Sequence, residues 1–423
     1  MSDNHFPVAT YEFAREFLTA SGCKPEQVEE RLARFHVEVP SWGFSRGGTR
    51  FGAYRDGSEA ETIEEKIADA ALVHRLTGTT PTVALHFPWD GSSDEDLARL
   101  QASLKREGVR AGAINSNTFS VRPEGALDNR LRLGSLTNPF ADVRAASIEH
   151  HQDCLRIMRR LQSKVLSVWL PDGTNSPGQG SFFDQADHLL AGLKRIYADL
   201  RDDEVMFVEY KLFEPGFYST AVADWGKAYT TCQALGPRAL VLVDLGHHPL
   251  GVNIEQIVSD LARLGRLAGF HFNDKKYADD DLASGSIDPY QLFRIFVTLV
   301  EADQRGLLKF DELAFMIDQS HMIKHPVEEM LESVENLQRA YAQALAVDWN
   351  RLKAARAEGD VSAADRILKS AFNDAPVAAI LQNMRRQKSL PADPMQEFRR
   401  LKDSGKVRGA RAVSHHVSLG LGA

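Results

Sequence analysis

Acidic and imidazole side chains close four successive hydrophobic segments in the second half of the sequence. These side chains are Glu209, Asp244, His271 and Asp318. Carboxylate oxygens combined with imidazole suit Mn²⁺, Mg²⁺ or Co²⁺, and the set lacks the thiolates of a structural zinc site. We therefore expect one cation to bind all four side chains, if the fold brings the four segment ends together.

Three more candidate ligands lie close to these in the sequence. His247 follows Asp244 by three residues, and Asp279 and Asp281 lie on the loop after the segment that carries His271. They could hold a second cation beside the first. Two divalent ions can bind both oxygens of a substrate, stabilise an alkoxide and lower the pKa of a bound water.

Lys211 and a set of aromatic residues complete the candidate site. Lys211 follows Glu209 by two residues, which places both on one face of a strand, and its ammonium suits a carbonyl oxygen. Aromatic or imidazole rings close the first four hydrophobic segments, where they could pack against the C–H faces of a sugar: Trp42, His86, Phe119 and Trp169. Each ring alone would equally suit a hydrophobic core.

Single residues of this set have ordinary structural explanations. Asp244 alone is better explained as a helix cap, and the acids at 279–281 alone are typical of a solvated loop. The agreement between neighbouring segment ends is what favours a metal site. His150 and His151 fall inside a predicted helix, so we interpret them as surface residues without a metal role.

The elements that must position these residues are eight apolar runs that alternate with helix-like stretches. Near-continuous apolar runs are typical of strands covered on both faces, and eight such units within about 290 residues favour a (β/α)₈ barrel over an open sheet. Catalytic groups of such barrels lie at the carboxyl ends of the strands. The predicted strands span residues 36–43, 81–87, 109–116, 163–170, 204–211, 239–246, 267–274 and 313–320.

The rest of the chain is predicted to be helical. A capping box begins a helix at Thr62, another helix spans Asp224 to Leu235, and residues 326–347 form an amphipathic helix. We expect an N-terminal helical segment over 1–35, the barrel catalytic domain over 36–346, and a helical C-terminal arm for oligomerisation over 347–423.

Composition excludes several classes of protein. The 423 residues carry 50 Lys and Arg against 58 Asp and Glu, a net charge of −8, which gives no general attraction to nucleic acid. The sequence has no membrane-spanning apolar run and no visible secretory signal, so we expect a cytoplasmic protein. Three distant cysteines argue against disulfides, and the usual nucleotide-binding, zincin and hydrolase motifs are missing.

Motifs along nearly the whole chain resemble those of L-rhamnose isomerases, particularly the bacterial branch with broad aldose specificity. They are VPSWGFSRGGTRF, HFPWD, NSNTF, DGTNSPGQ, EYKLFEPGFYST, LVDLGHH, GFHFNDKKYADDDL and MIDQSH, in the family's order between about residues 36 and 345. The resemblance implies a metal-dependent (β/α)₈ sugar isomerase similar to xylose isomerase. It also implies a homotetramer with two Mn²⁺ per subunit, or Co²⁺, Mg²⁺ or Zn²⁺ instead.

The resemblance also implies roles for single residues. Glu209, Asp244, His271 and Asp318 resemble the ligands of a structural metal, and His247, Asp279 and Asp281 those of a catalytic metal. Lys211 resembles a contact to a substrate oxygen, and Trp42, His86, Phe119 and Trp169 are expected to line the sugar pocket. Phe51 resembles an aromatic residue that a neighbouring subunit inserts. Tyr210 and Pro171 depart from the family pattern, which affects the preferred sugar.

The implied reaction interconverts L-rhamnose and L-rhamnulose, with D-allose and D-ribose as further candidate aldoses. Hydrogen would move between C1 and C2 by a hydride shift, which we favour, or through an ene-diol, which needs a free general base. A ketose 3-epimerase of the same superfamily is the alternative, although Asp318 stands where it would need a second glutamate. A nucleic-acid-processing barrel is less favoured, because the basic stretch 385–411 lacks interleaved aromatic residues.

Overall fold

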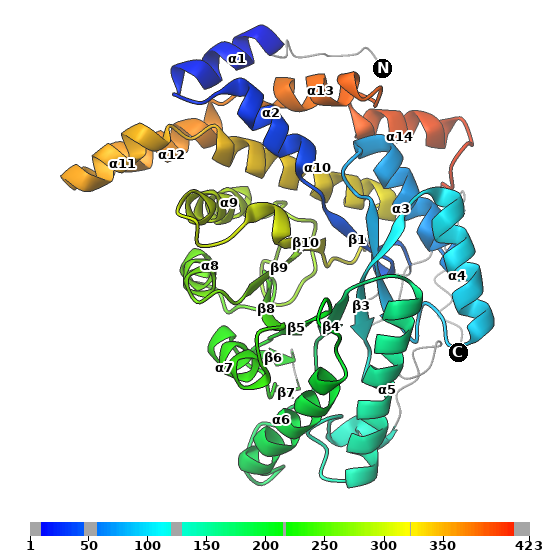
Figure 1. The fold of residues 1–423 in the computed structure, drawn as a ribbon. Coiled ribbons are helices and arrows are strands. Elements are labelled where there is room, and N and C mark those ends of the chain that lie inside the picture. The colour runs from blue at the N-terminus through cyan, green and yellow to red at the C-terminus, as the bar shows by residue number, and fades with distance from the viewer. Residues whose placement is uncertain (1–9, 46–56, 120–128, 215–216, 322, 410–423) are drawn as a thin grey trace, which may run out of the picture.

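A closed barrel of eight parallel strands forms the centre of the molecule (Figure 1). The structure is a computed structural model that describes residues 10–45, 57–119, 129–214, 217–321 and 323–409. The barrel strands follow the order β1-β10-β9-β8-β5-β4-β3-β2. Their bounds are β1 (Glu38–Pro40), β2 (Thr82–Phe87), β3 (Arg110–Ser116), β4 (Val165–Val168), β5 (Val205–Glu209), β8 (Ala239–Asp244), β9 (Leu267–Phe272) and β10 (Ala314–Ile317).

All eight predicted strands and the predicted (β/α)₈ architecture are confirmed. The strands are apolar on both faces because their outer side chains pack under helices and their inner side chains meet inside the barrel. Ala113, Phe207, Leu242, Ala268 and Met316 form one inner layer. A small antiparallel hairpin of β6 (Phe213–Glu214) and β7 (Tyr218–Ser219) follows β5 outside the barrel.

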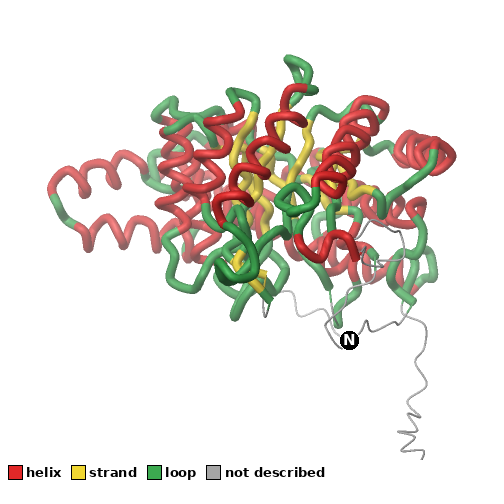
Figure 2. Tube along the Cα trace, turned by 90° about the horizontal axis from the view of Figure 1, so that it is seen from below, coloured by secondary structure: helices red, strands yellow, loops and turns green. Residues whose placement is uncertain are grey.

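Helices surround the barrel, as Figure 2 shows from a perpendicular direction. Those that follow barrel strands are α3 (Ile63–Thr77), α4 (Asp94–Glu107), α5 (Ala141–Arg160), α6 (Phe182–Ala198), α7 (Trp225–Leu235), α8 (Ile254–Arg263), α9 (Pro289–Gln304) and α10 (Pro326–Leu345). Short 3₁₀ turns occupy η1 (Trp42–Phe44), η2 (Asn129–Leu133) and η3 (Phe310–Glu312). Among the described residues, no helix is both long and apolar enough to cross a membrane.

Local sequence explains where the predicted helices begin and end. The Thr62 hydroxyl accepts a hydrogen bond from the Glu65 amide, and the Glu65 carboxylate accepts one from the Thr62 amide, so the expected capping box starts α3. Asp224 caps α7. The apolar face predicted for α10 is buried, and its Tyr341 ring stacks on Phe310 at 4.3 Å. Capping residues therefore predict α3 and α7 correctly, and the amphipathic pattern predicts α10.

Six helices of the described chain lie outside the barrel. These are α1 (Tyr11–Ala20), α2 (Pro25–Arg34), α11 (Trp349–Glu358), α12 (Val361–Asn373), α13 (Val377–Gln387) and α14 (Pro394–Asp403). Four of them, α2, α12, α13 and α14, pack against α10. Helices α1, α2, α13 and α14 lie together along one side of the molecule, whereas α11 and α12 form a hairpin that projects beyond it (Figures 1 and 2).

Basic residues of the C-terminal stretch form ion pairs within the chain. Lys402 Nζ lies 2.6 Å from Glu328 Oε1, Arg408 contacts Asp69 at 2.7 Å, and the buried Arg385 contacts Glu335 at 3.1 Å. These contacts support the interpretation of the stretch as a packed helical extension, and they leave less positive charge for a nucleic-acid surface.

Two histidines differ from their prediction as surface residues. His151 is fully buried, with its Nδ1 atom 2.7 Å from the Ser147 carbonyl, and His150 is only partly exposed. The reason is that both lie on α5, a helix of 20 residues, and the face with His151, Cys154 and Met158 packs against the barrel. Their burial is structural and gives no reason to assign a metal there.

Candidate functional site

Barrel closure brings the four predicted strand-end ligands together. Glu209 ends β5, Asp244 ends β8, His271 lies near the end of β9, and Asp318 follows β10 directly. These strands are consecutive in the barrel, and one ligand atom from each residue lies within 4.8 Å of the others. His271 Nδ1 is 3.2 Å from Glu209 Oε1, 3.6 Å from Asp318 Oδ2 and 3.8 Å from Asp244 Oδ2.

Burial and charge make this group suitable for a cation. Neither ring nitrogen of His271 makes a hydrogen bond with a described residue, although both atoms are buried. Burial, together with repulsion from Glu209 and Asp318, raises the pKa of Asp244 to about 7. Three buried carboxylates around one imidazole repel one another, which is costly unless a positive ion compensates their charge. The donor set of three carboxylates and one imidazole therefore fits a divalent metal.

A second ligand group shares Asp244 with the first. One ligand atom each from Asp244, His247 and Asp279 lie within 4.8 Å of one another. His247 Nε2 is 3.5 Å from Asp279 Oδ1, while its Nδ1 is 2.9 Å from the Tyr210 carbonyl oxygen. We assign the proton to Nδ1, which donates to that carbonyl, so Nε2 carries a lone pair toward the site.

Asp281 lies beside this second group but not in it. Its carboxyl lines the same pocket, and burial and the charge of Asp279 raise its pKa well above its ordinary value. Its backbone is left-handed, with φ of 48°, and its carbonyl accepts a hydrogen bond from Ser320. Of the three predicted ligands of the second cation, His247 and Asp279 therefore lie in one group with Asp244, and Asp281 lies next to that group.

Lys211 lies between the second ligand group and the ring of Trp169. Its Nζ atom is 2.6 Å from Asp279 Oδ2, 2.9 Å from Glu214 Oε2 and 5.2 Å from the centre of the Trp169 ring. Burial would lower the pKa of Lys211, but the charges of Asp279 and Glu214 outweigh it and raise the pKa above its ordinary value. The buried ammonium therefore stays charged at neutral pH and can donate to a ligand oxygen.

A cavity of about 200 Å³ opens over these groups at the carboxyl ends of the strands. The four predicted rings line this cavity and form an aromatic wall. The centre of the His86 ring lies 5.4 Å from that of Trp42 and 6.0 Å from that of Phe119, and the ring centres of Phe119 and Trp169 are 5.2 Å apart. The aromatic wall is also bonded to the first ligand group, because the Trp42 indole N–H donates a hydrogen bond to Asp318 Oδ1 at 2.8 Å. This contact arises because β1 pairs with β10 where the barrel closes.

Several residues of the site were missed by sequence reasoning. Asn273 donates to both carboxylate oxygens of Asp244 at 3.0 and 3.2 Å, and Trp89 stacks on His86 at 4.3 Å. Asn115 and Ser167 form a polar part of the cavity wall. Period-two spacing from His271 could have identified Asn273. Phe51 lies outside the described residues.

Comparison with known proteins identifies similar chains. A probable sugar isomerase of Rhizobium meliloti (strain 1021) is 43% identical over 389 residues, which are 92% of this chain and 89% of the relative. One of Mesorhizobium japonicum (strain LMG 29417 / CECT 9101 / MAFF 303099) is 42% identical over 403 residues, or 95% and 92% of the two chains. No family model matches the chain.

Solved structures resemble this chain in fold. A D-allulose 3-epimerase from Methylomonas sp. superimposes with a TM-score of 0.53 at 11% identity, over 72% of this chain and 98% of that one. Its complex with D-allulose gives the same TM-score at 13% identity, over 73% and 97%. At such low identity the likeness concerns the barrel alone.

Proposed function

This chain belongs to the family of the two rhizobial probable sugar isomerases, and on that premise we propose that it interconverts an aldose and its ketose, with L-rhamnose and L-rhamnulose as the first pair to test. The observation that carries the proposal is the second ligand group of Asp244, His247 and Asp279 beside the first. A single-cation enzyme would have no use for it, whereas an aldose–ketose isomerase that binds two adjacent substrate oxygens would.

The residues fit two divalent ions, for which we propose Mn²⁺. Glu209, Asp244, His271 and Asp318 would hold one ion, and Asp244, His247 and Asp279 would hold the other. When bound, such ions polarise a carbonyl and stabilise a neighbouring alkoxide. Asn273 would fix the shared carboxylate of Asp244 by its two hydrogen bonds.

The remaining pocket residues would bind and orient the sugar. Lys211 would donate a charge-assisted hydrogen bond to the carbonyl oxygen at C1 or C2. The rings of Trp42, Phe119 and Trp169 would cover the C–H faces of the sugar and exclude water, which favours transfer of hydrogen between carbons over its loss to solvent. The buried Ser167 hydroxyl and Trp169 indole have no hydrogen-bond partner among the described residues, so both are free for sugar hydroxyls.

Two routes for the hydrogen shift differ in their need for a base. A hydride shift from C2 to C1 needs no free carboxylate, whereas an ene-diol route needs a base to remove the C2 proton. Asp281 and the imidazole of His86 line the pocket outside both ligand groups and are the candidates for that base. We favour the hydride shift because it needs no such base, and because the two ligand groups would together hold the two substrate oxygens between whose carbons the hydrogen moves.

Deuterium tracing tests both the activity and the route. The protein is stripped with a chelator, restored with Mn²⁺ and supplied with L-rhamnose deuterated at C2, and the ketose is analysed by NMR. We expect metal-dependent formation of L-rhamnulose with the label at C1. Label lost to water would overturn the hydride shift, and no turnover of L-rhamnose, D-allose or D-ribose with any divalent metal would overturn the isomerase proposal.

A ketose 3-epimerase is the second candidate, because the first ligand group alone would hold the single cation that such a reaction uses. Asp318 argues against the epimerase, because a proton shuttle between paired glutamates would need a glutamate at this position. Incubation of the Mn²⁺-loaded protein with D-fructose in deuterated water separates the two. Incorporation of deuterium at C3 would establish epimerisation, whereas formation of an aldose without C3 exchange would support isomerisation.

A further inference from the structure

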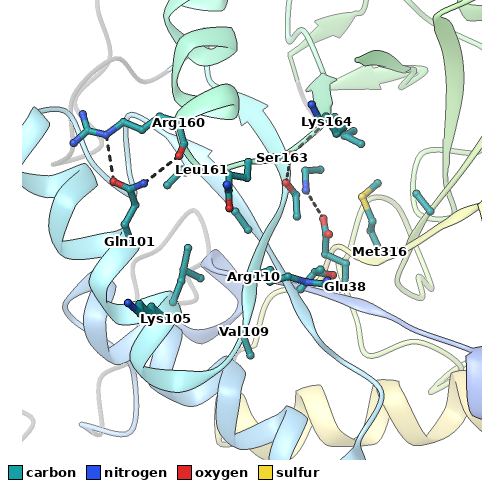
Figure 3. A pocket seen from close by; sticks show the side chains of 18 of the residues that line it. Glu38, Gln101, Lys105, Val109, Arg110, Arg160, Leu161, Ser163, Lys164 and Met316 are labelled. Carbon is teal, nitrogen blue, oxygen red and sulfur yellow. Dashed lines mark hydrogen bonds between the residues drawn. The ribbon is translucent and has the colours of Figure 1, made fainter. Parts of the chain in front are cut away.

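A second and larger cavity of about 560 Å³ opens at the opposite, amino-terminal end of the barrel (Figure 3). Its lining includes residues from the start of β1 to β4 and from the ends of α4 and α5. Glu38, Thr82 and Arg110 come from the first three strands, and Gln101 and Arg160 come from the two helices. This volume lies in the range of small-molecule sites, and no residue of the sugar pocket lines it.

The floor of this amino-terminal cavity is apolar and lies directly beneath the proposed metal site. Phe207 precedes Glu209 by two residues on β5, and Met316 precedes Asp318 by two residues on β10, so each pair faces the barrel interior. Gly112 leaves room for the Glu38 side chain, since a Cβ atom there would collide with its carboxylate. The cavity therefore extends from the surface into the barrel as far as this inner layer.

Glu38 provides a deep hydrogen-bond acceptor. Its Oε1 atom accepts a hydrogen bond from the Ala113 amide at 2.8 Å, and the Thr82 hydroxyl also bonds to the carboxylate. Burial raises the pKa of Glu38 above its ordinary value. A carboxylate has about four acceptor positions, so two donors leave capacity for a ligand hydroxyl group.

The rim of the cavity is cationic. The lining contains the exposed or partly exposed cations Lys105, Arg110, Arg160 and Lys164, which Figure 3 labels, and Glu38 is the one acid among the lining residues. Arg160 pairs with Asp94, and Lys164 Nζ lies 2.6 Å from Asp203 Oδ2; both acids are exposed and outside the lining. Neither Lys105 nor Arg110 forms an ion pair with another described residue.

We propose that this cavity binds a small phosphorylated polyol, such as a sugar phosphate. Two unpaired cations at the rim suit a phosphate, which a net charge of −8 for the whole chain would otherwise repel. A fully anionic ligand would be repelled at depth by Glu38, so the buried end must carry hydroxyl donors. Phe207 and Met316 would pack against the C–H faces of its carbon chain.

Calorimetric titration of the Mn²⁺-loaded full-length protein with D-glucose 6-phosphate tests the proposal. We expect saturable binding at low salt, at least tenfold weaker binding of inorganic phosphate or D-glucose, and at least tenfold weaker binding of the probe to the double variant Lys105→Ala, Arg110→Ala. The Glu38→Gln variant should bind the sugar phosphate more weakly than the wild type does, but should bind inorganic phosphate equally well. Lys309→Ala, which removes an exposed lysine elsewhere, should bind as the wild type does.

The same titration on Lys211→Met locates the binding site. Lys211 lines the sugar pocket but not the amino-terminal cavity. Unchanged affinity of this variant for D-glucose 6-phosphate therefore supports binding in the amino-terminal cavity. Loss of affinity in Lys211→Met would overturn the proposal by placing the probe at the sugar pocket. Absence of binding to the wild type, or equal binding to the rim double variant, would overturn it as well. None of these outcomes depends on the isomerase activity.

Discussion

His271 is buried among the carboxylates of Glu209, Asp244 and Asp318, and this environment predicts how metal binding depends on pH. Burial alone would lower the pKa of His271, but the three negative charges raise it to about 10. A metal ligand must be a neutral imidazole, so the ion has to displace a proton from His271 at neutral pH. Because the metal-free site holds more protons than the loaded one, affinity must increase as the pH increases.

We therefore expect Mn²⁺ affinity to increase by roughly tenfold per pH unit between pH 6 and 8 for each proton released. Asp244, with a pKa of about 7, contributes a second proton mainly below pH 7. Calorimetric titrations in buffers of different ionisation enthalpy count the released protons directly. Equal affinity across this range would show that His271 is already neutral in the metal-free protein.

Asp279 is the ligand whose loss should separate chemistry from folding. Asp279→Asn keeps the shape of the side chain but removes a charge that faces both His247 and Lys211. We expect turnover to fall by roughly 100-fold or more, because charge at the reacting centre is lost, with little change in the melting temperature. Steady-state kinetics and thermal unfolding measure the two effects, and Asp365→Asn on the exposed face of α12 is the matched control. Near-normal turnover would refute the assignment.

The residues of the site that the sequence predicted are those at strand ends. Glu209, Asp244 and His271 were predictable because a barrel must bring together the carboxyl ends of successive strands. Trp89 and Asn273 were not singled out, since their importance lies in contacts with His86 and Asp244 that depend on loop conformation. Spacing along the chain carries little information about such contacts.

At the scale of elements, one buried carboxylate joins two loops at the mouth of the sugar pocket. Asp172 follows β4 and accepts four hydrogen bonds, from the backbone amides and hydroxyls of Ser135 and Thr137, all between 2.8 and 2.9 Å. This connection holds the segment after Trp169 against the β3–α5 loop. The conformation of Trp169, and with it the shape of the pocket, should depend on this connection.

Asp172→Asn should therefore disturb both stability and substrate binding. An amide can accept at only one of its two terminal atoms, so two of the four donors lose their partner and the free energy of unfolding should fall by about 2 to 4 kcal/mol. We also expect KM to rise more than kcat falls, because no ligand group is altered. Denaturant unfolding and steady-state kinetics test this, with Asp184→Asn, on a more exposed part of the neighbouring α6, as the control. An unchanged KM would contradict the positioning role.

The sequence predicts all eight barrel strands, but it predicts their ends less accurately than their presence. Six of the eight predicted runs continue two or three residues past the end of the strand, as at 204–211 against Val205–Glu209, and the other two end with their strand. The extra residues are those that leave the hydrogen-bonded ladder to enter the site, so their composition still matches a strand while their backbone does not. The hairpin β6–β7 has strands of two residues, which are too short to give an alternating pattern.

At the scale of the whole molecule, the helices after the barrel are attached through α10. The Arg385 guanidinium is buried, and it lies 3.1 Å from Glu335 Oε1 and 2.6 Å from Gln338 Oε1 on α10. A charged group at such a position must be paired to be tolerated, which explains why a stretch with so polar a composition packs closely against the barrel. Composition alone predicted helices there, but it gave no sign of which basic residues would be buried.

The rest of the described chain covers little of helix α12 in the projecting hairpin α11–α12. Within α12 only Ala371 is buried, and Val361 at its start is 76% exposed. An apolar residue on a projecting helix suits the predicted role of the C-terminal arm in oligomerisation. In a symmetric assembly each interface of this kind would contain Val361 twice.

Val361→Lys should therefore weaken the predicted homotetramer without unfolding the subunit. Burying one valine contributes about 1.5 to 3 kcal/mol, so two copies per interface should raise the dissociation constant roughly 100-fold or more. Light scattering over a dilution series measures this, with circular dichroism as the check on folding. Ser362→Lys adds the same charge at the adjacent exposed position of α12 and should dissociate less. A wild-type protein that is monomeric throughout, or a Val361→Lys variant with the wild-type mass at every concentration, would show that the hairpin serves no subunit contact through Val361.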